Sequence, residues 1–400
     1  MEKFKFVNKI SSLDKTRLYY PLLLLLFGSI VLSYKLGNIP KALSLSQLSI
    51  RNNLISHLYN YHYLLHHLLT FPFYSYLVIL NYLNNHNLVL IGLVGYLCGI
   101  LAIFLFYYIA ETFTNKLIGA LTTGLFGTSL WFLQITRNSQ SLEYYSFAIL
   151  LGIFIAILYY RKKSINLLVV LSSILLGLAF YIPCMIWFSL LFIIINFKII
   201  KYEIHALSIK YKSISISIFC LMLAPVVYES VLNHSLIYRI LSLPRSINLH
   251  QILIQFIDYP KLLFVQNNPA LGFSVGQLPL VNFASAIILI FAAIWLYKNH
   301  KNTLTAYIYL SLAVDWVLCA LNGNQSIYII LPLLSLLVSI GIFYLYNEWK
   351  KIFPKNPYPD FTAKFLIVIL VASIGLYQIL LYFIVWPHTP QVLAIYSHYL

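Results

Sequence analysis

Residues 87–110 read NLVLIGLVGYLCGILAIFLFYYIA, a run without a single charged side chain. An α-helix needs about 20 apolar residues to cross the hydrocarbon core of a bilayer. Only helices or closed barrels satisfy every backbone polar group there, and a run of this length is too long for a barrel strand. The run therefore predicts a membrane-spanning helix and decides the fold class.

Further apolar runs of similar character occur along the whole chain. They cover residues 19–34, 117–136, 143–160, 165–182, 184–200, 213–232, 279–297, 303–321, 326–346 and 365–386. The chain is 61% hydrophobic and 9% charged, whereas a soluble domain carries about 25% charged residues. We expect an all-α, polytopic transmembrane helical bundle of about eleven spans, with residues 1–400 forming a single transmembrane domain.

The basic residues lie in short segments between the apolar runs, as orientation signals do. With the N-terminus inside and the runs alternating sides, 19 of the 26 Lys and Arg residues fall on the inner side. The outer side keeps Lys35, Lys41, Arg51, Arg137, Arg239, Arg245 and Lys261. The positive-inside rule thus predicts an inner N-terminus and an outer C-terminus. The same clustering argues against a nucleic-acid partner, despite the net charge of +16.

Two predicted outer segments are long enough to carry a functional site. The first outer loop, 35–86, contains an apolar stretch at 71–83 that is too short to span a bilayer, so we expect interfacial helices there. The second, 233–278, is predicted as a long late outer loop. The many Ile, Asn, Lys and Tyr residues are typical of an AT-rich genome and favour a multi-pass protein of a bacterial plasma membrane.

Short motifs follow one another in order along the first half of the chain. They are YKLGNIPKALSLSQLSI at 34–50, FPFYSY at 71–76, ETFTNK at 111–116, TSLWFLQITR at 128–137 and YYRKK at 159–163. In order and spacing, these motifs resemble the start of bacterial GT-C glycosyltransferases, which are membrane enzymes related to protein mannosyltransferases and aminoarabinose transferases. The resemblance covers residues 19–200.

The resemblance implies a GT-C-like fold and the transfer of a sugar from a polyprenyl-phosphate donor to an acceptor on the outer face. In that family a carboxylate of the first outer loop is the general base, and basic residues hold the lipid phosphate. The base takes the proton of an attacking hydroxyl, and the cation stabilises the departing phosphate. The implied partners are a polyprenyl-phosphate sugar and membrane lipids, and no cofactor is implied.

The chain departs from the family pattern at the expected base. The positions of the family acids hold Ser46 and Gln47, and residues 35–86 contain no Asp or Glu. Glu143, six residues after Arg137, is the candidate substitute base. A histidine of the first outer loop is the other option, because imidazole titrates near neutral pH.

Basic and polar residues of the outer side are the candidate substrate ligands. Arg137 is the best candidate to hold the phosphate, because an Arg at the mouth of a span is costly unless it is paired or solvated. The other candidates are His62, His66, Asp258, Arg239 and Arg245. His62 and His66 have a metal-ligand spacing, but no acidic cluster accompanies them, so we expect no tightly bound divalent metal.

Two alternatives remain open. The loss of the first-loop acids also fits a catalytically inactive GT-C-like protein that retains lipid or partner binding. Asp315, near the middle of a predicted span, favours a membrane transporter or flippase, because a carboxylate at that depth usually faces a cavity or a partner.

Overall fold

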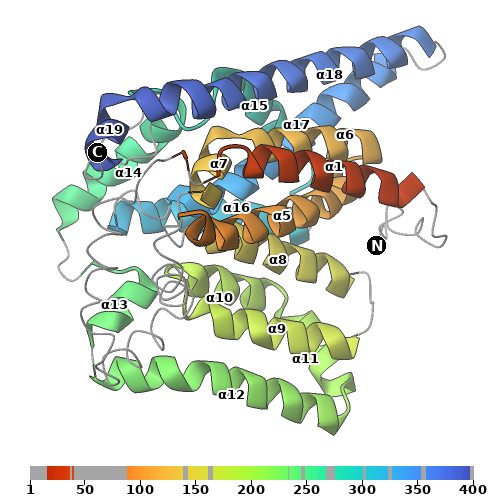
Figure 1. The fold of residues 1–400 in the computed structure, drawn as a ribbon. Helices are drawn as coiled ribbons and strands as arrows, with labels where there is room; N and C mark the ends of the chain where they lie inside the picture. The colour runs from red at the N-terminus through yellow and green to blue at the C-terminus, as the bar shows by residue number, and fades with distance from the viewer. Residues whose placement is uncertain are drawn as a thin grey trace.

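The computed structural model describes most of the chain outside residues 1–15 and 40–87. The described residues are 16–36, 38–39, 88–137, 143–160, 165–232, 234–244, 248–266, 275–300, 303–322, 327–352 and 357–396. Within these ranges the secondary structure is helical, with no strand. Figure 1 shows the helices as a layered bundle, with α18 (Pro357–Leu380) and α12 (Ile209–Leu232) at opposite edges.

Four of the described helices are long and apolar enough to cross a membrane by length and composition. They are α5 (Leu88–Phe113), α12, α17 (Ile327–Ile352) and α18 with its continuation to His388. A fifth results if α6 (Lys116–Thr128) and α7 (Leu130–Arg137) form one bent span. The chain is therefore all-α, with the long apolar helices that a membrane protein requires.

Shorter apolar helices coincide with six more of the predicted runs. They are α1 (Thr16–Ser33), α8 (Glu143–Tyr160), α9 (Ile165–Ala179), α10 (Met185–Ile195), α15 (Phe283–Lys298) and α16 (Thr303–Asn322). The positions of the helices thus agree with the apolar pattern, while the number of membrane crossings stays a prediction.

Two predicted spans are interrupted in the structure. The run 117–136 is broken between α6 and α7, which are bent by 58°. In the run 184–200, the first helix ends at its C-cap Asn196, whose side-chain amide donates to the carbonyl of Phe192 at 3.0 Å. The chain then continues as α11 (Phe197–Ala206). Polar side chains that bond to the local backbone favour such helix ends over helix interiors.

The late outer segment, 233–278, is not simply a loop. It contains α13 (Ser235–Leu241) and α14 (Leu249–Phe264). The side chain of Asn248 caps α14 by accepting from the amide of Gln251 at 3.3 Å, and the helix packs against α16. The segment therefore contains helices, and its place as an outer segment between two spans stays a prediction.

The bundle core is built from closely packed helices. The strongest contacts join α15 to α17, α9 to α12, and α5 to both α6 and α8. Glycine allows the closest approach, since a Cβ at Gly341 of α17 would overlap the carbonyl oxygen of Ile288 in α15. Small residues at helix interfaces are typical of helices that pack within a membrane.

The two ends of the bundle carry different short helices. Figure 1 shows α11 at one end, with α13, α14 and α19 (Pro390–Tyr396) at the other. The predicted inner segment 198–212 and the predicted outer segment 233–278 therefore contribute helices to opposite ends.

Candidate functional site

The break between α6 and α7 places a short helix at an angle inside the bundle. Ser129 forms the break with an extended backbone, and its hydroxyl donates to the carbonyl of Phe126 at 2.7 Å. The first N–H groups of α7 lack helical partners. One of them, at Leu130, donates to the Oε1 atom of Gln378 in α18 at 3.1 Å. The break is thus held by polar contacts as well as by packing.

Helix α7 packs closely against α5 at two glycines of α5, Gly95 and Gly99. A Cβ at Gly95 would overlap the carbonyl oxygen of Thr136, and one at Gly99 would lie 3.0 Å from the Thr136 methyl group. The Thr136 hydroxyl donates to the carbonyl oxygen of Phe132, in the same helix, at 2.7 Å. These contacts fix the last turn of α7, which ends at Arg137.

The Arg137 side chain is buried, with only 4% of its surface exposed. Its Nη2 atom donates to the carbonyl oxygen of Tyr34 at 2.7 Å. Its guanidinium carbon lies 5.2 Å from the ring centre of Tyr382 and 5.0 Å from that of Phe383. Rings at this distance attract a cation through their quadrupoles. The structure thereby joins two motifs that stand about a hundred residues apart in the sequence.

The rings of Tyr382 and Phe383 form an aromatic platform next to the Arg137 guanidinium, at an irregular turn that follows α18. Residues Leu381–Val385 form the π-helix η2, followed by the 3-10 helix η3 (Trp386–His388). The wider turn lets the successive residues Tyr382 and Phe383 both face the guanidinium. Tyr382 stacks on Trp386 with ring centres 5.3 Å apart. Single π-helical turns are frequent at functional sites.

Two polar side chains at the end of α7 carry buried atoms that have no hydrogen-bond partner among the described residues. The Nε and Nη1 atoms of Arg137 are buried and unpaired there. Both amide atoms of Gln134, one turn earlier on α7, are buried and unpaired in the same way. A buried polar group without a partner costs about 1–3 kcal/mol, and more when it is charged. The arrangement therefore presents donors, and one amide acceptor, suited to a polar ligand.

The other predicted site residues are placed only in part. Ser46, Gln47, His62, His66 and Arg245 lie outside the described residues. Glu143 is the first residue of α8 and Arg239 lies in α13, but the described part of the structure does not include either side chain. Asp258 is half-buried on α14. The pairing of Arg137 with Glu143 therefore stays a prediction.

Asp315 forms a second buried polar cluster, between α14 and α16. Its side chain is fully buried, and its Oδ2 atom accepts from the hydroxyl of Tyr259 at 2.5 Å. Cys319, one turn later, lies 3.9 Å from the same oxygen. Next to this pair, the indole of Trp316 donates to the carbonyl of Phe256 at 2.8 Å. This carboxyl group joins two packed helices through its Oδ2 atom, whereas its Oδ1 atom is buried without a partner among the described residues.

Sequence reasoning missed several residues of these sites. Gln134 lies three residues before Arg137, so helical spacing alone would have placed both on one face of α7. Gln378 and Tyr382 are distant in the sequence, and only the fold brings them to α7. Nothing in the sequence indicated that Tyr259 would be the hydrogen-bond partner of Asp315, apart from its place next to the candidate Asp258.

Comparison with known proteins adds no relative to these observations. No family model matches the chain, and no curated protein is significantly similar to it.

Proposed function

We propose that the chain is a GT-C-type membrane glycosyltransferase that binds a polyprenyl-phosphate sugar on the outer face and transfers the sugar to an acceptor. The proposal includes a bundle of about eleven spans with the N-terminus inside and the C-terminus outside, in a bacterial plasma membrane. It rests on the motif resemblance and on the surroundings of Arg137.

The observation that carries the proposal is a buried guanidinium with unpaired donors at the end of a broken helix. Among the described side chains no carboxylate pairs with Arg137, although a buried charge is costly without a partner. Nε and Nη1 are charged donors of the kind that bind phosphate oxygens through charge-assisted hydrogen bonds. A lipid phosphate supplies the missing negative charge.

The proposed chemistry needs one base and one cation. Glu143 begins α8 only a short segment after Arg137, so we assign it the role of taking the acceptor proton. Arg137 stabilises the phosphate that departs from the anomeric carbon. The amide of Gln134 is available for a hydroxyl of the sugar or an oxygen of the phosphate.

Binding tests the first half of the proposal. The purified full chain is titrated with a labelled polyprenyl-phosphate sugar, and Arg137→Gln is compared with Lys261→Gln, an exposed cation of α14. We expect Arg137→Gln to weaken binding by about 10- to 100-fold, because a charge-assisted hydrogen bond contributes about 1.5–3 kcal/mol. Equal affinities for the two variants would remove the phosphate site.

Turnover tests the second half. The reconstituted protein receives the labelled donor and an outer-leaflet acceptor extract, and sugar release or transfer is followed. We expect turnover that Glu143→Gln abolishes while binding is retained. Turnover that survives Glu143→Gln would withdraw the base assignment, and retained binding without any turnover would withdraw the transferase.

A second candidate is a protein of the same fold that binds the lipid phosphate without transferring the sugar. One observation favours it: the first outer loop, 35–86, contains no Asp or Glu at all. Binding without turnover in the wild-type protein is its expected result.

A transporter or flippase is the third candidate, favoured by the broken helix α6–α7. Interrupted helices line the substrate sites of many transporters. This candidate predicts movement of the labelled lipid between leaflets without sugar release, and Asp315→Asn would stop that movement. Unchanged movement in Asp315→Asn would exclude coupling through this carboxyl group.

A further inference from the structure

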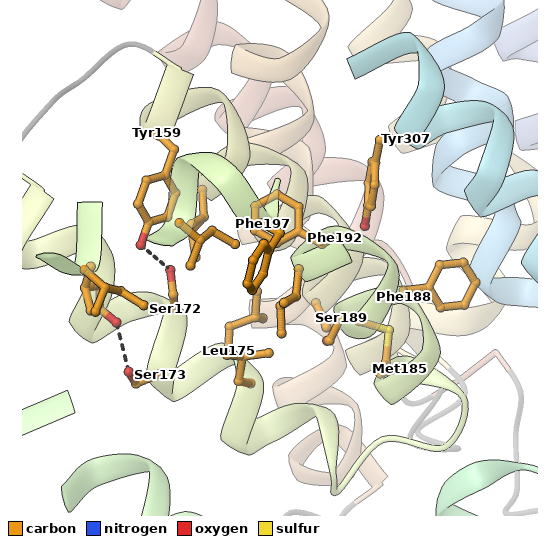
Figure 2. Close-up of a pocket in the computed structure, with 18 of the residues that line it drawn as sticks. Tyr159, Ser172, Ser173, Leu175, Met185, Phe188, Ser189, Phe192, Phe197 and Tyr307 are labelled. Carbon is orange, nitrogen blue, oxygen red and sulfur yellow. Dashed lines mark hydrogen bonds between the residues drawn. The ribbon is translucent and has the colours of Figure 1, made fainter. Parts of the chain in front are cut away.

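A groove of about 450 Å³ runs between α8, α9, α10 and α11. Its volume is within the range of about 300–1,000 Å³ that is typical of small-molecule sites. Figure 2 shows its walls, to which α10 and α11 contribute Phe192 and Phe197, α9 contributes Leu175, and α16 contributes Tyr307. None of the residues around Arg137 lines this groove, so it is a separate site.

The walls of the groove offer little polarity to a ligand. The hydroxyl of Ser172 donates to the carbonyl of Leu168 at 2.7 Å and also contacts the Tyr159 hydroxyl at 3.2 Å. The hydroxyl of Ser173 donates to the carbonyl of Val169 at 3.0 Å. Because these hydroxyls are used within the protein, the walls suit a hydrocarbon chain better than a polar molecule.

One end of the groove is cationic. The groove is lined by one face of α11, which carries Phe197, Ile200, Lys201, Ile204 and His205. This spacing puts the aromatic and aliphatic side chains beside the basic ones on a single helical stripe. Lys201 and His205 are one turn apart and both exposed, and no carboxylate of the described side chains pairs with Lys201.

The surroundings of this end are also positively charged. Lys198 on α11 and Lys210 at the start of α12 are exposed, and Lys212 in the first turn of α12 is half-buried. The positive-inside rule predicts that this end lies on the inner side. Anionic lipids give the inner leaflet a negative surface potential, and Lys and Arg residues near the surface are attracted to it.

We propose that the groove binds an anionic phospholipid of the membrane, with one acyl chain between α9, α10 and α11 and the phosphate at Lys201 and His205. The apolar walls exclude a soluble anion as the main ligand, and the cationic end selects an anionic over a zwitterionic head group. This lipid site is independent of the proposed sugar transfer.

The test compares two lipids that share their acyl chains. The full chain is reconstituted with equal amounts of phosphatidylglycerol and phosphatidylcholine, extracted, and analysed by native mass spectrometry for retained lipid. We expect phosphatidylglycerol to be retained at least about 5-fold over phosphatidylcholine, as a cation at a phosphate is worth about 1 kcal/mol or more. Equal retention of the two lipids would overturn the proposal.

Matched variants locate the site. Lys201→Gln removes a charge from the groove, whereas Lys198→Gln removes the same charge from the same helix outside the groove. We expect Lys201→Gln to abolish the preference for phosphatidylglycerol and Lys198→Gln to keep it. Equal losses in both variants would show that only the general surface charge attracts the lipid, and would overturn the assignment to the groove.

A third variant tests the acyl-chain part. A Cβ at Gly152 would lie 3.6 Å from the nearest atom, Cδ2 of Leu175, so α8 accommodates a larger side chain that then extends into the groove. We expect Gly152→Leu to lose the retained lipid. Full retention of phosphatidylglycerol in Gly152→Leu would contradict the proposal.

Discussion

Two buried side chains of charged residue types, Arg137 and Asp315, lie in different surroundings. Asp315 lies within the continuous helix α16, where its Oδ2 atom accepts a short hydrogen bond from Tyr259 of α14 and its Oδ1 atom is unpaired in the described structure. Arg137 lies where α7 ends after a 58° break and against a π-helical turn, with two of its donor atoms unpaired in the described structure. The two sites thus differ in the regularity of the backbone and in the number of polar atoms left unpaired, which is one at Asp315 and two at Arg137.

The largest expected effect concerns the packing that holds α7 in place. Gly95→Ala puts a Cβ against the carbonyl oxygen of Thr136, so α5 and α7 must separate. We expect a loss of about 3 kcal/mol in stability, as in overpacked cores. The apparent melting temperature in detergent measures it, together with weaker binding of the lipid phosphate.

Gly124→Ala is the matched control for this change. No atom lies within 4 Å of a Cβ at Gly124 in α6, so the substitution meets open space. We expect it to stabilise the helix by about 0.5–1 kcal/mol, because alanine loses less backbone entropy than glycine. Equal melting of Gly95→Ala and the wild type would show that α7 is free to move.

The next effect tests whether Asp315 is structural. Tyr259→Phe removes the hydroxyl that donates to the buried carboxyl group. We expect a loss of about 2 kcal/mol in stability, because a buried acceptor is left without its partner. Binding of the lipid phosphate at Arg137 should not change.

A double substitution makes this test more specific. In Tyr259→Phe together with Asp315→Leu, both polar partners are replaced by apolar groups, which restores much of the stability. Additive losses in the double variant would mean that the two side chains do not act as a pair, and that Asp315 is stabilised by other groups.

Arg137→Met tests whether the buried guanidinium of Arg137 lowers the stability of the ligand-free protein. Because the guanidinium is buried with unpaired donors, an apolar side chain of similar length should raise the stability of the ligand-free protein by about 1–2 kcal/mol. The same variant should lose binding of the lipid phosphate. A lower melting temperature would instead assign Arg137 a structural role through Tyr34 and the Tyr382 ring.

The sequence predicted the positions of the apolar helices because hydrocarbon length alone determines them. It also singled out Arg137, at the mouth of a predicted span, and Asp315, near the middle of one, as charged residues that need a partner or solvent. It did not predict the break at Ser129, because a run of apolar residues has the same hydropathy whether the helix is straight or bent. The surrounding GTS residues at 127–129 were the available signal, since Thr and Ser bond to their own backbone.

The partners of the two charges were beyond sequence reasoning for a different reason. Tyr259 lies in a segment predicted as a loop, and Tyr382 faces Arg137 only because η2 widens the helical turn. Neither contact follows from local spacing, because each depends on how distant helices pack. Sequence patterns therefore indicated which side chains need partners, and the fold supplied the partners.

The smallest effect concerns Gln378, which connects the break to the helix that carries the aromatic platform. Gln378→Leu leaves the Leu130 N–H without its acceptor, so we expect a loss of about 1 kcal/mol in stability. Ser373→Ala is the control on the same helix, because the exposed Ser373 hydroxyl donates only to Ile369 of α18 at 2.8 Å.

Lipid binding shows whether this contact matters for the site. Gln378 holds the start of α7, whereas η2 follows directly after α18, so one helix sets both the position of Arg137 and that of Tyr382. Loosening the contact should therefore weaken binding of the lipid phosphate by a few fold, even though Gln378 is not itself a proposed ligand. If Gln378→Leu loses stability while its affinity equals that of Ser373→Ala, the break serves packing alone, and the irregular geometry around Arg137 is not tuned for a ligand.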